Sequence, residues 1–198
     1  MQPRGDYRVS VTKDYLTFAA AHFITFSGHR CESLHGHNYR AGVMIEGTLE
    51  PESWYVFDFV ALKRIMRMLC DEIDHKVLLP LENPHLRIAE REGSITVAYD
   101  DKPRYLFPTA DCALLPVPNT TVEMLARHLA HRLHAKLTET GAGASRLTTI
   151  ELEVEESVGQ SAIYRMQPGV DAPLGPGRSS ARSAASPVSV LDRGESGP

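Results

Sequence analysis

Residues 31–46 of the chain read CESLHGHNYRAGVMIE. The second half of this stretch has an apolar residue at every second position. These apolar residues are Tyr39, Ala41, Val43 and Ile45. Such a period of two is typical of a β-strand that buries one face. The stretch therefore predicts a half-buried strand, and its first half places chemically reactive side chains at the start of that strand.

Two histidines lie in that first half. His35 and His37 are separated by Gly36, and on a strand residues two apart project to the same side. Both imidazoles can then bind one metal ion, and His22 can join them if the preceding strand is a neighbour. Three neutral imidazoles suit zinc and leave a fourth position open for water or substrate. A closed structural zinc site with Cys31 as fourth ligand is one alternative, and histidines that bind no metal are another.

Strand patterns recur elsewhere in the chain. Residues 7–18 are rich in β-branched and aromatic residues, and residues 150–155 alternate apolar residues with glutamates. Both segments are predicted to be strands, and residues 162–165 a short last strand.

Two helices are predicted between these strands. The first has Asp58 as its N-cap and carries one apolar stripe. This stripe comprises Leu62, Ile65, Met66, Leu69 and Ile73. The second begins near Thr120, which has capping-box spacing to Glu123, and ends at Gly141. Leucines at positions 125, 129, 133 and 137 form its apolar face.

This order of elements predicts an α+β domain with a four-stranded antiparallel sheet and two helices packed on one face. We expect the domain to span residues 1–167. Residues 80–118 form an extended insertion between the helices, in which 95–99 and 104–107 can pair as a hairpin. In residues 168–198, 16 of 31 residues are Gly, Pro or Ser, which predicts a disordered tail.

Composition excludes several classes of protein. The net charge is −4 with scattered Lys and Arg, so no basic field for nucleic acid is expected. Apolar runs are shorter than the roughly 20 residues that span a bilayer, and the first residues do not resemble a secretory signal. The cysteines, at positions 31, 70 and 112, do not have a disulfide-framework spacing. A reducing cytoplasm is therefore the expected location.

Five segments in register resemble one family. They are Phe18-Ala19-Ala20-Ala21-His22, the segment from Cys31 to Tyr39, Ile73-Asp74-His75-Lys76, Thr121-Val122-Glu123, and Val154-Glu155-Glu156-Ser157 followed by Tyr164. Together they resemble the 6-pyruvoyl- and 6-carboxytetrahydropterin synthases, over roughly residues 7–165. The resemblance implies the tunnelling fold (T-fold) and zinc on His22, His35 and His37. The insertion is longer than the usual link in that family, and the tail has no counterpart there.

The resemblance also implies a reaction. The bacterial branch of the family, which belongs to the queuosine pathway, converts 7,8-dihydroneopterin triphosphate to 6-carboxy-5,6,7,8-tetrahydropterin, acetaldehyde and triphosphate. Two other products stay open: 6-pyruvoyltetrahydropterin, and 6-hydroxymethyl-7,8-dihydropterin for folate synthesis. The last of these is linked to a glutamate placed as Glu32 is, so Cys31 and Glu32 together suggest a dual activity.

Residue roles follow from the resemblance. Cys31 is the expected proton-abstracting base, with His29, Arg30 and the metal as cationic neighbours. Asp74 and His75 would form a proton relay. Glu156 would bind the pterin edge, and Thr121 would add backbone contacts; read without the family, these two are a solvated carboxylate and a helix cap.

The resemblance further implies a homohexamer, a dimer of trimers, in which closure removes sheet edges. Active sites would lie between subunits, so that Glu156 serves a neighbour's zinc. Outside this family, a zinc hydrolase and a zinc-stabilised binding module remain as alternatives.

Overall fold

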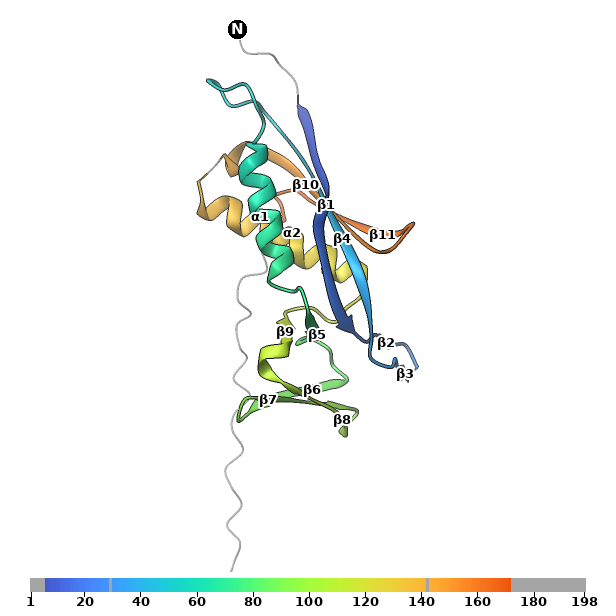
Figure 1. The fold of residues 1–198 in the computed structure, drawn as a ribbon. Coiled ribbons are helices and arrows are strands. Elements are labelled where there is room, and N and C mark those ends of the chain that lie inside the picture. Colours follow the sequence, from blue (N-terminus) through green and yellow to red (C-terminus); the bar gives the residue numbers. More distant parts are fainter. Residues whose placement is uncertain (1–5, 29, 142, 172–198) are drawn as a thin grey trace, which may run out of the picture.

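Two long antiparallel strands, β1 (Tyr7–His22) and β4 (His35–Gly47), form the centre of the protein in the computed structural model (Figure 1). The structure describes residues 6–28, 30–141 and 143–171. On one side of this pair lie β10 (Leu147–Ser157) and then β11 (Gln160–Met166), both antiparallel to their neighbours. These four strands confirm the antiparallel sheet that the alternating patterns predict.

The sheet continues beyond β1, and the prediction of four strands is wrong. β5 (Lys76–Pro80) pairs in parallel with β1, and β9 (Cys112–Leu115) pairs in parallel with β5. The order of the six strands is β11-β10-β4-β1-β5-β9. Both added strands are short apolar segments without alternation, so no period of two marks them in the sequence.

An irregularity interrupts β1 halfway along its length. Thr12 pairs with Gly42, whereas Thr17 pairs with Arg40, so β1 carries extra residues relative to β4. Such a bulge bends the strand and increases its twist. Strand β1 therefore continues past the predicted end at Phe18 and still places its last residue, His22, opposite His35.

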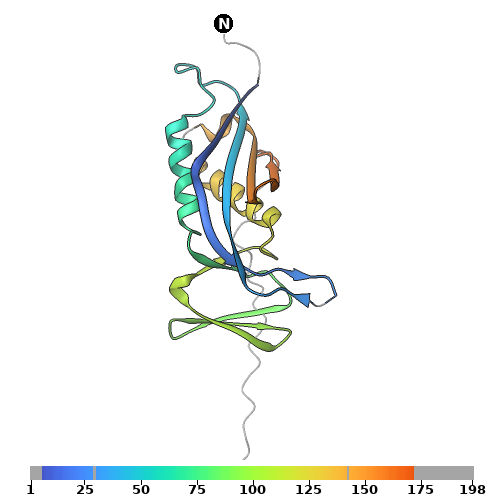
Figure 2. The ribbon, with the colours of Figure 1, turned by 45° about the vertical axis from the view of Figure 1, so that its right-hand side comes forward.

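Both helices cover the same face of the sheet, as the two views agree (Figures 1 and 2). Helix α1 (Phe59–Asp71) begins at Asp58, whose carboxylate accepts a hydrogen bond from the Val60 amide at 2.8 Å. Helix α2 (Val122–Glu139) contacts β10 and β11. The predicted leucine face of α2 is fully buried in the main core, which lies between the helices and the sheet.

The ends of α2 are confirmed in part. Gly141 adopts φ +64° just after the helix and donates a hydrogen bond to the Thr138 carbonyl at 3.2 Å, which is the C-terminal cap that the sequence predicts. The capping box is wrong: Thr121 is the N-cap residue and its side chain makes no capping hydrogen bond. The Thr120 hydroxyl instead donates to the Phe23 carbonyl at 3.0 Å.

Residues 80–118 fold into a second, three-stranded antiparallel sheet made of β6 (Leu86–Arg91), β7 (Ser94–Tyr99) and β8 (Lys102–Pro108). The β7–β8 pairing confirms the predicted hairpin. A short 3₁₀ turn, Thr109–Asp111, then leads into β9. This sheet lies at the end of the main sheet where the small hairpin of β2 (Thr25–Phe26) and β3 (Arg30–Cys31) also lies (Figures 1 and 2).

The insertion has an apolar core of its own. Phe23 and Leu79 from the main domain pack there with Ile95 and Val97 from the insertion. A second 3₁₀ turn, Ala144–Arg146, precedes β10.

The predicted tail begins in a described turn: the amides of Val170 and Asp171 donate to the Gln167 carbonyl. The rest of the tail, 172–198, lies outside the described residues. Within the described part of the chain, neither helix combines the length and apolarity that crossing a membrane requires.

Candidate metal and substrate site

Three imidazoles converge at the shared end of β1 and β4. The pairing of His22 with His35, and of Ala20 with His37, brings the three side chains to one face of the sheet. Ring centroids lie 4.7 Å apart for His22 and His35, and 4.9 Å apart for His35 and His37. One ligand nitrogen from each ring lies within 4.8 Å of the others. The same-side geometry that the sequence predicts is therefore present.

Backbone carbonyls orient two of these rings. Nδ1 of His22 lies 2.8 Å from the Thr120 carbonyl, and Nδ1 of His35 lies 2.9 Å from the Ser33 carbonyl. A carbonyl can only accept, so each Nδ1 carries the proton and each Nε2 keeps a free lone pair. Metal-binding histidines are commonly held in this way.

The ring nitrogens that have no hydrogen-bond partner indicate whether a metal ion fits this group of histidines. Nε2 of His22 and Nε2 of His37 are buried and have no hydrogen-bond partner in the described residues. Burial lowers the pKa of His22 and so favours its neutral, ligating form. Buried nitrogens without a partner are costly, and coordination to a metal ion would satisfy them. The donor set of three imidazoles fits zinc.

Cys31 does not belong to this group of nitrogens. Among the described residues, the set of ligand atoms within 4.8 Å holds the three histidines and not Cys31. Its thiol instead contacts the Glu32 carbonyl at 3.7 Å and packs beside the core of the insertion. A closed site with Cys31 as fourth ligand is therefore not what the structure describes.

Gly36 allows β4 to approach β1 closely between the two histidines. A Cβ at this position would lie 3.1 Å from the Ala20 carbonyl oxygen, which is closer than side chains normally come to backbone. The His-Gly-His spacing thus serves both the ligands and the pairing of the strands.

Glu156, near the end of β10, reaches the same group of histidines. Its Oε1 lies 3.4 Å from Nε2 of His22 and 3.5 Å from Nε2 of His37. The buried Tyr39 hydroxyl donates to the same oxygen at 3.4 Å. Burial and this carboxylate raise the pKa of Tyr39 far above its usual value, so the phenol keeps its proton. Glu156 therefore faces the histidines of its own chain, whereas the sequence analysis gave it to a neighbour's zinc.

Glu32 flanks the histidines on another side. Its Oε2 lies 3.8 Å from Nδ1 of His35 and is buried without a hydrogen-bond partner in the described residues. Thr121 lies next to Thr120, the residue that orients His22.

The Cys31 thiol has a cationic neighbour that was not predicted from the sequence. Arg30 lies over the Phe26 ring at 5.5 Å, and His29 is outside the described residues. Burial raises the pKa of Cys31, while the Arg104 guanidinium lowers it in part. The cation comes from the insertion, and sequence reasoning did not find it.

Asp74 and His75 form a pair, as predicted. Nδ1 of His75 lies 3.0 Å from Oδ2 of Asp74, and Oδ1 of Asp74 accepts the Ala19 amide at 2.8 Å. Burial opposes ionisation of Asp74, but these two contacts lower its pKa on balance. The imidazole of His75 is 82% exposed.

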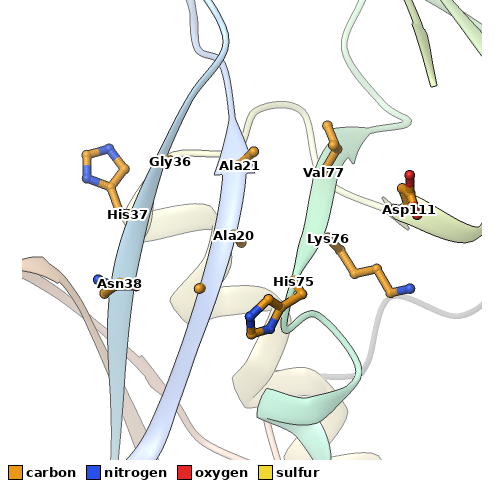
Figure 3. Close-up of a pocket in the computed structure, with 10 residues that line it drawn as sticks. Ala20, Ala21, Gly36, His37, Asn38, His75, Lys76, Val77 and Asp111 are labelled. Carbon is orange, nitrogen blue, oxygen red and sulfur yellow. The ribbon is translucent and has the colours of Figure 1, made fainter. Parts of the chain in front are cut away.

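The paired strands β1 and β4 separate the His75 ring from the His37 ring. Figure 3 shows the two rings on either side of these ribbons, with His37 pointing away. Both residues nevertheless line one open pocket of about 490 Å³, together with Lys76 and Asp111. The structure therefore brings together His22, His35, His37, Glu32 and Glu156, and leaves Asp74 and His75 outside that group.

The fold and the site define an α+β domain with a group of three histidines that could hold a metal ion, beside two carboxylates. The sequence matches the model of the 6-pyruvoyl tetrahydropterin synthase family over residues 10–167. The chain belongs to this family.

Two relatives illustrate its range. The chain is 36% identical over 150 residues to a putative 6-carboxy-5,6,7,8-tetrahydropterin synthase of Methanocaldococcus jannaschii, covering 76% of this chain and 90% of that protein. It is 35% identical over 97 residues to the dihydroneopterin monophosphate aldolase of Pyrococcus furiosus, covering 46% of this chain and 75% of the aldolase.

Solved structures agree on the fold. The 6-pyruvoyl tetrahydropterin synthase of Plasmodium falciparum superposes with a TM-score of 0.76 at 29% identity, over 83% of this chain and 99% of that one. A Plasmodium vivax synthase in which a catalytic glutamate is replaced by alanine gives 0.75 at 27% identity, with the same coverage. These neighbours support the T-fold that the resemblance implies.

Proposed function

We propose that the chain is a zinc-dependent lyase that converts 7,8-dihydroneopterin triphosphate and one water molecule to 6-carboxy-5,6,7,8-tetrahydropterin, acetaldehyde and triphosphate, as a step toward queuosine and other 7-deazaguanines. The observation that carries the proposal is the group of three imidazoles beside Glu156, two of which have a buried, unpartnered nitrogen. The name of the Methanocaldococcus jannaschii relative supports this choice of product.

The histidines would hold zinc through Nε2 of His22 and His37 and through His35. Zinc would supply a Lewis acid that polarises a side-chain hydroxyl of the substrate. Glu156 would accept two hydrogen bonds from the amidine-like edge of the pterin. Tyr39 holds Oε1 of Glu156 with a proton that it does not release near neutral pH, and so fixes the direction of that carboxylate.

Cys31 would abstract a proton from the substrate side chain as its thiolate. Burial makes the thiolate costly, and Arg104 offsets part of that cost. His75 would carry protons to and from the substrate. Because Asp74 accepts from Nδ1 of His75, Nε2 is the atom available for this exchange.

The direction of the His37 ring, which points away from His75, supports assembly (Figure 3). We propose a homohexamer, in which the Asp74–His75 pair from one subunit completes the site of another. Each site would then consist of one chain's histidines and Glu156 with a neighbour's His75.

A second activity is favoured by Glu32. Its carboxylate faces His35 at 3.8 Å and has a buried, unpartnered oxygen, which suits a group that exchanges protons with a substrate. The Pyrococcus furiosus relative is named as an aldolase, and a glutamate is described as a catalytic residue in the Plasmodium vivax synthase. Cleavage of the side chain to 6-hydroxymethyl-7,8-dihydropterin is therefore our second candidate.

The test is an incubation of zinc-loaded protein with dihydroneopterin triphosphate, followed by chromatography of pterins and detection of the aldehyde. We expect 6-carboxytetrahydropterin with acetaldehyde. Formation of 6-pyruvoyltetrahydropterin would change the product assignment within the family. Ester or amide cleavage by the zinc-loaded protein, with the pterin left intact, would instead favour a zinc hydrolase.

A further inference from the structure

We propose that the three-stranded sheet β6–β8 braces the loop that carries Cys31 and Glu32, with Arg104 and Tyr105 as positioning residues. This inference rests on the proposed function, because it concerns the geometry of that function's acid-base groups. It assigns a task to the long insertion, which the reaction itself does not require.

Two adjacent residues of β8 bind the backbone of this loop. Nη2 of Arg104 donates to the Glu32 carbonyl at 2.7 Å and to the Cys31 carbonyl at 3.3 Å. The Leu34 amide donates to the Tyr105 hydroxyl oxygen at 3.1 Å. These contacts join segments more than 70 positions apart in the sequence. The insertion thus holds three of the four residues from Cys31 to Leu34.

The loop has little regular structure to hold it otherwise. β3 ends at Cys31 and consists of two residues, paired with the equally short β2. The Glu32 amide donates to the Ile24 carbonyl, and regular pairing resumes at His35. Two-stranded hairpins of this length are at best marginally stable alone. External hydrogen bonds therefore decide the conformation between β3 and β4.

The conformation matters because Cys31 and Glu32 are neighbours. On an extended strand their side chains would point in opposite directions, and so would their carbonyls. Here one guanidinium nitrogen binds both carbonyls, so the two peptide units face the same strand, β8. The brace thereby sets an irregular backbone on which both side chains can serve one substrate.

Apolar packing gives the brace a rigid base. The Tyr105 ring lies 5.3 Å from the Phe23 ring and stacks with Phe107 at 5.4 Å. Cys31 and Leu34 pack against the same cluster. The Arg104 guanidinium lies 5.2 Å above the Tyr105 ring, a cation–π arrangement that restrains the long side chain.

The charge of Arg104 adds to its geometric role. The groups that act on the Cys31 thiol are Arg104, which favours the thiolate, and Glu32 and Asp100, which oppose it. Tyr99 of β7 also lies close enough to interact with this thiol. Loss of Arg104 would leave the carboxylates of Glu32 and Asp100 as the charged groups acting on the thiol. A smaller fraction of Cys31 would then be in the thiolate form.

The experiment compares Arg104→Met and Tyr105→Phe with Arg87→Met as the matched control. Arg87 lies on the same small sheet, in an exposed salt bridge with Asp101 in which both side chains are 75% exposed. Tyr105→Phe keeps the ring and removes the acceptor of the Leu34 amide. Thermal unfolding of each variant first establishes that it is folded.

Three readouts follow on the zinc-loaded protein. Hydrogen exchange at the Leu34 amide should accelerate about 3- to 10-fold in Tyr105→Phe, the value of one net hydrogen bond. Peptide-resolved alkylation of Cys31 by iodoacetamide at neutral pH should slow several-fold in Arg104→Met. Turnover in Arg104→Met should lose about 10- to 100-fold in kcat, with KM within about twofold of the unchanged protein. Arg87→Met should match the unchanged protein in all three.

Unchanged Leu34 exchange together with unchanged Cys31 alkylation would overturn the brace, whatever the enzyme does. A raised KM with unchanged kcat in Arg104→Met would make Arg104 a substrate ligand instead and would also overturn it. If the unchanged protein made no tetrahydropterin, the proposed function would fail. The exchange and alkylation results would still decide separately whether the insertion positions this loop.

Discussion

At His22 and His35, the proton position is set by residues that bind no metal themselves. The carbonyls of Thr120 and Ser33 accept from Nδ1 and leave Nε2 free. Because the Thr120 carbonyl precedes helix α2, the position of that helix is coupled to the orientation of a ligand. Changes in ligand geometry are therefore expected from substitutions that alter the backbone before α2.

Loss of one imidazole should release the metal. In His35→Ala, two nitrogen ligands remain, and we expect zinc content to fall to less than about a tenth of that in the unchanged protein, because loss of a group that only hydrogen-bonds a ligand already costs about 10- to 100-fold in affinity. The fold should largely remain, since β4 buries its own apolar face. Elemental analysis after dialysis measures this, with His85→Ala as a control that keeps its zinc. Full zinc in His35→Ala would refute the ligand assignment.

Substitutions at Cys31 and at Glu32 should affect different reaction products. Cys31→Ala should lose 6-carboxytetrahydropterin by at least about 10²- to 10⁴-fold, the usual contribution of a general acid-base group. If Glu32 supports side-chain cleavage, Cys31→Ala still releases 6-hydroxymethyl-7,8-dihydropterin, and Glu32→Ala does not. Chromatography of both reactions decides the matter. An unchanged product ratio in Glu32→Ala would leave the dual activity without support.

The sequence could predict the ligands but not their environment. His35 and His37 are recognisable because their spacing and a strand pattern occur within one short segment. The contacts of Thr120 and Arg104 span 98 and 72 positions, and no local pattern distinguishes a threonine that binds a histidine from one that caps a helix.

Among the elements, β4 is held along both edges, by β1 on one side and by β10 on the other. Gly47 at its end faces Tyr7 on one side and Leu147 on the other. A Cβ at Gly47 would overlap the carbonyl oxygen of Arg146, which belongs to the backbone. The Arg146 backbone and β4 cannot then both keep their positions.

Gly47→Ala should therefore lower the free energy of unfolding by about 1–3 kcal/mol, the usual range for an overpacked site. Gly42→Ala in the same strand is the matched control. A Cβ there would meet the Thr12 hydroxyl at 3.4 Å, an ordinary contact, so a change below about 1 kcal/mol is expected. Urea denaturation at one protein concentration compares the two, and equal stability would contradict the steric argument.

Helix α2 contains a histidine, His128, that makes the stability of the protein depend on pH. Burial lowers the pKa of His128 from 6.5 to about 4, with Arg132 and His131 acting in the same direction. As the pH falls, His128 therefore binds a proton in the unfolded chain before it does so in the folded protein. Its contribution to the free energy of unfolding is fully present above pH 6.5 and is lost as the pH drops toward 4. At pH 5 this group alone costs about 2 kcal/mol.

His128→Gln should lose less stability between pH 7 and pH 5 than the unchanged protein, by about 1–2 kcal/mol. Both proteins share the other histidines, so the difference between the two denaturation series isolates this residue. Parallel pH profiles would show that folding does not lower the pKa of His128.

The predicted helices and strands are confirmed where burial of one face alone produces the sequence pattern. β4 and β10 alternate because one face is buried, and α1 and α2 carry an apolar stripe for the same reason. β5 and β9 were missed because KVLLP and CALL are too short and too uniformly apolar to show a period. Their place in the sheet depends on β1 and cannot be read from either segment.

At the scale of the whole molecule, the His37 ring points away from His75, although both residues line one pocket (Figure 3). We therefore expect a site that uses both side chains to combine two copies of the chain. We expect a hexamer by light scattering, and a fully active monomer would contradict it.

Mixed oligomers test the sharing of sites directly. Cys31→Ala and His75→Ala should each be inactive alone, since each removes a proton-transfer group. When the two are unfolded and refolded together, some sites regain an intact Cys31 and an intact His75. Random assembly should restore about a quarter of the activity. Activity that stays at the level of the separate variants would show that each chain uses its own His75.

The parallel pairing of β5 with β9 has a consequence for the ancestry of the chain. In an antiparallel hairpin, an inserted segment enters and leaves at neighbouring points and can be excised with a short splice. Here the chain leaves β5 at Pro80 but returns at Cys112, which lies beside Val77 at the opposite end of the pair. A chain without the inserted segment would have to span about 10 Å along the sheet to join Pro80 to Cys112. Loss of the small sheet with β9 kept would thus require a linker of at least about three residues.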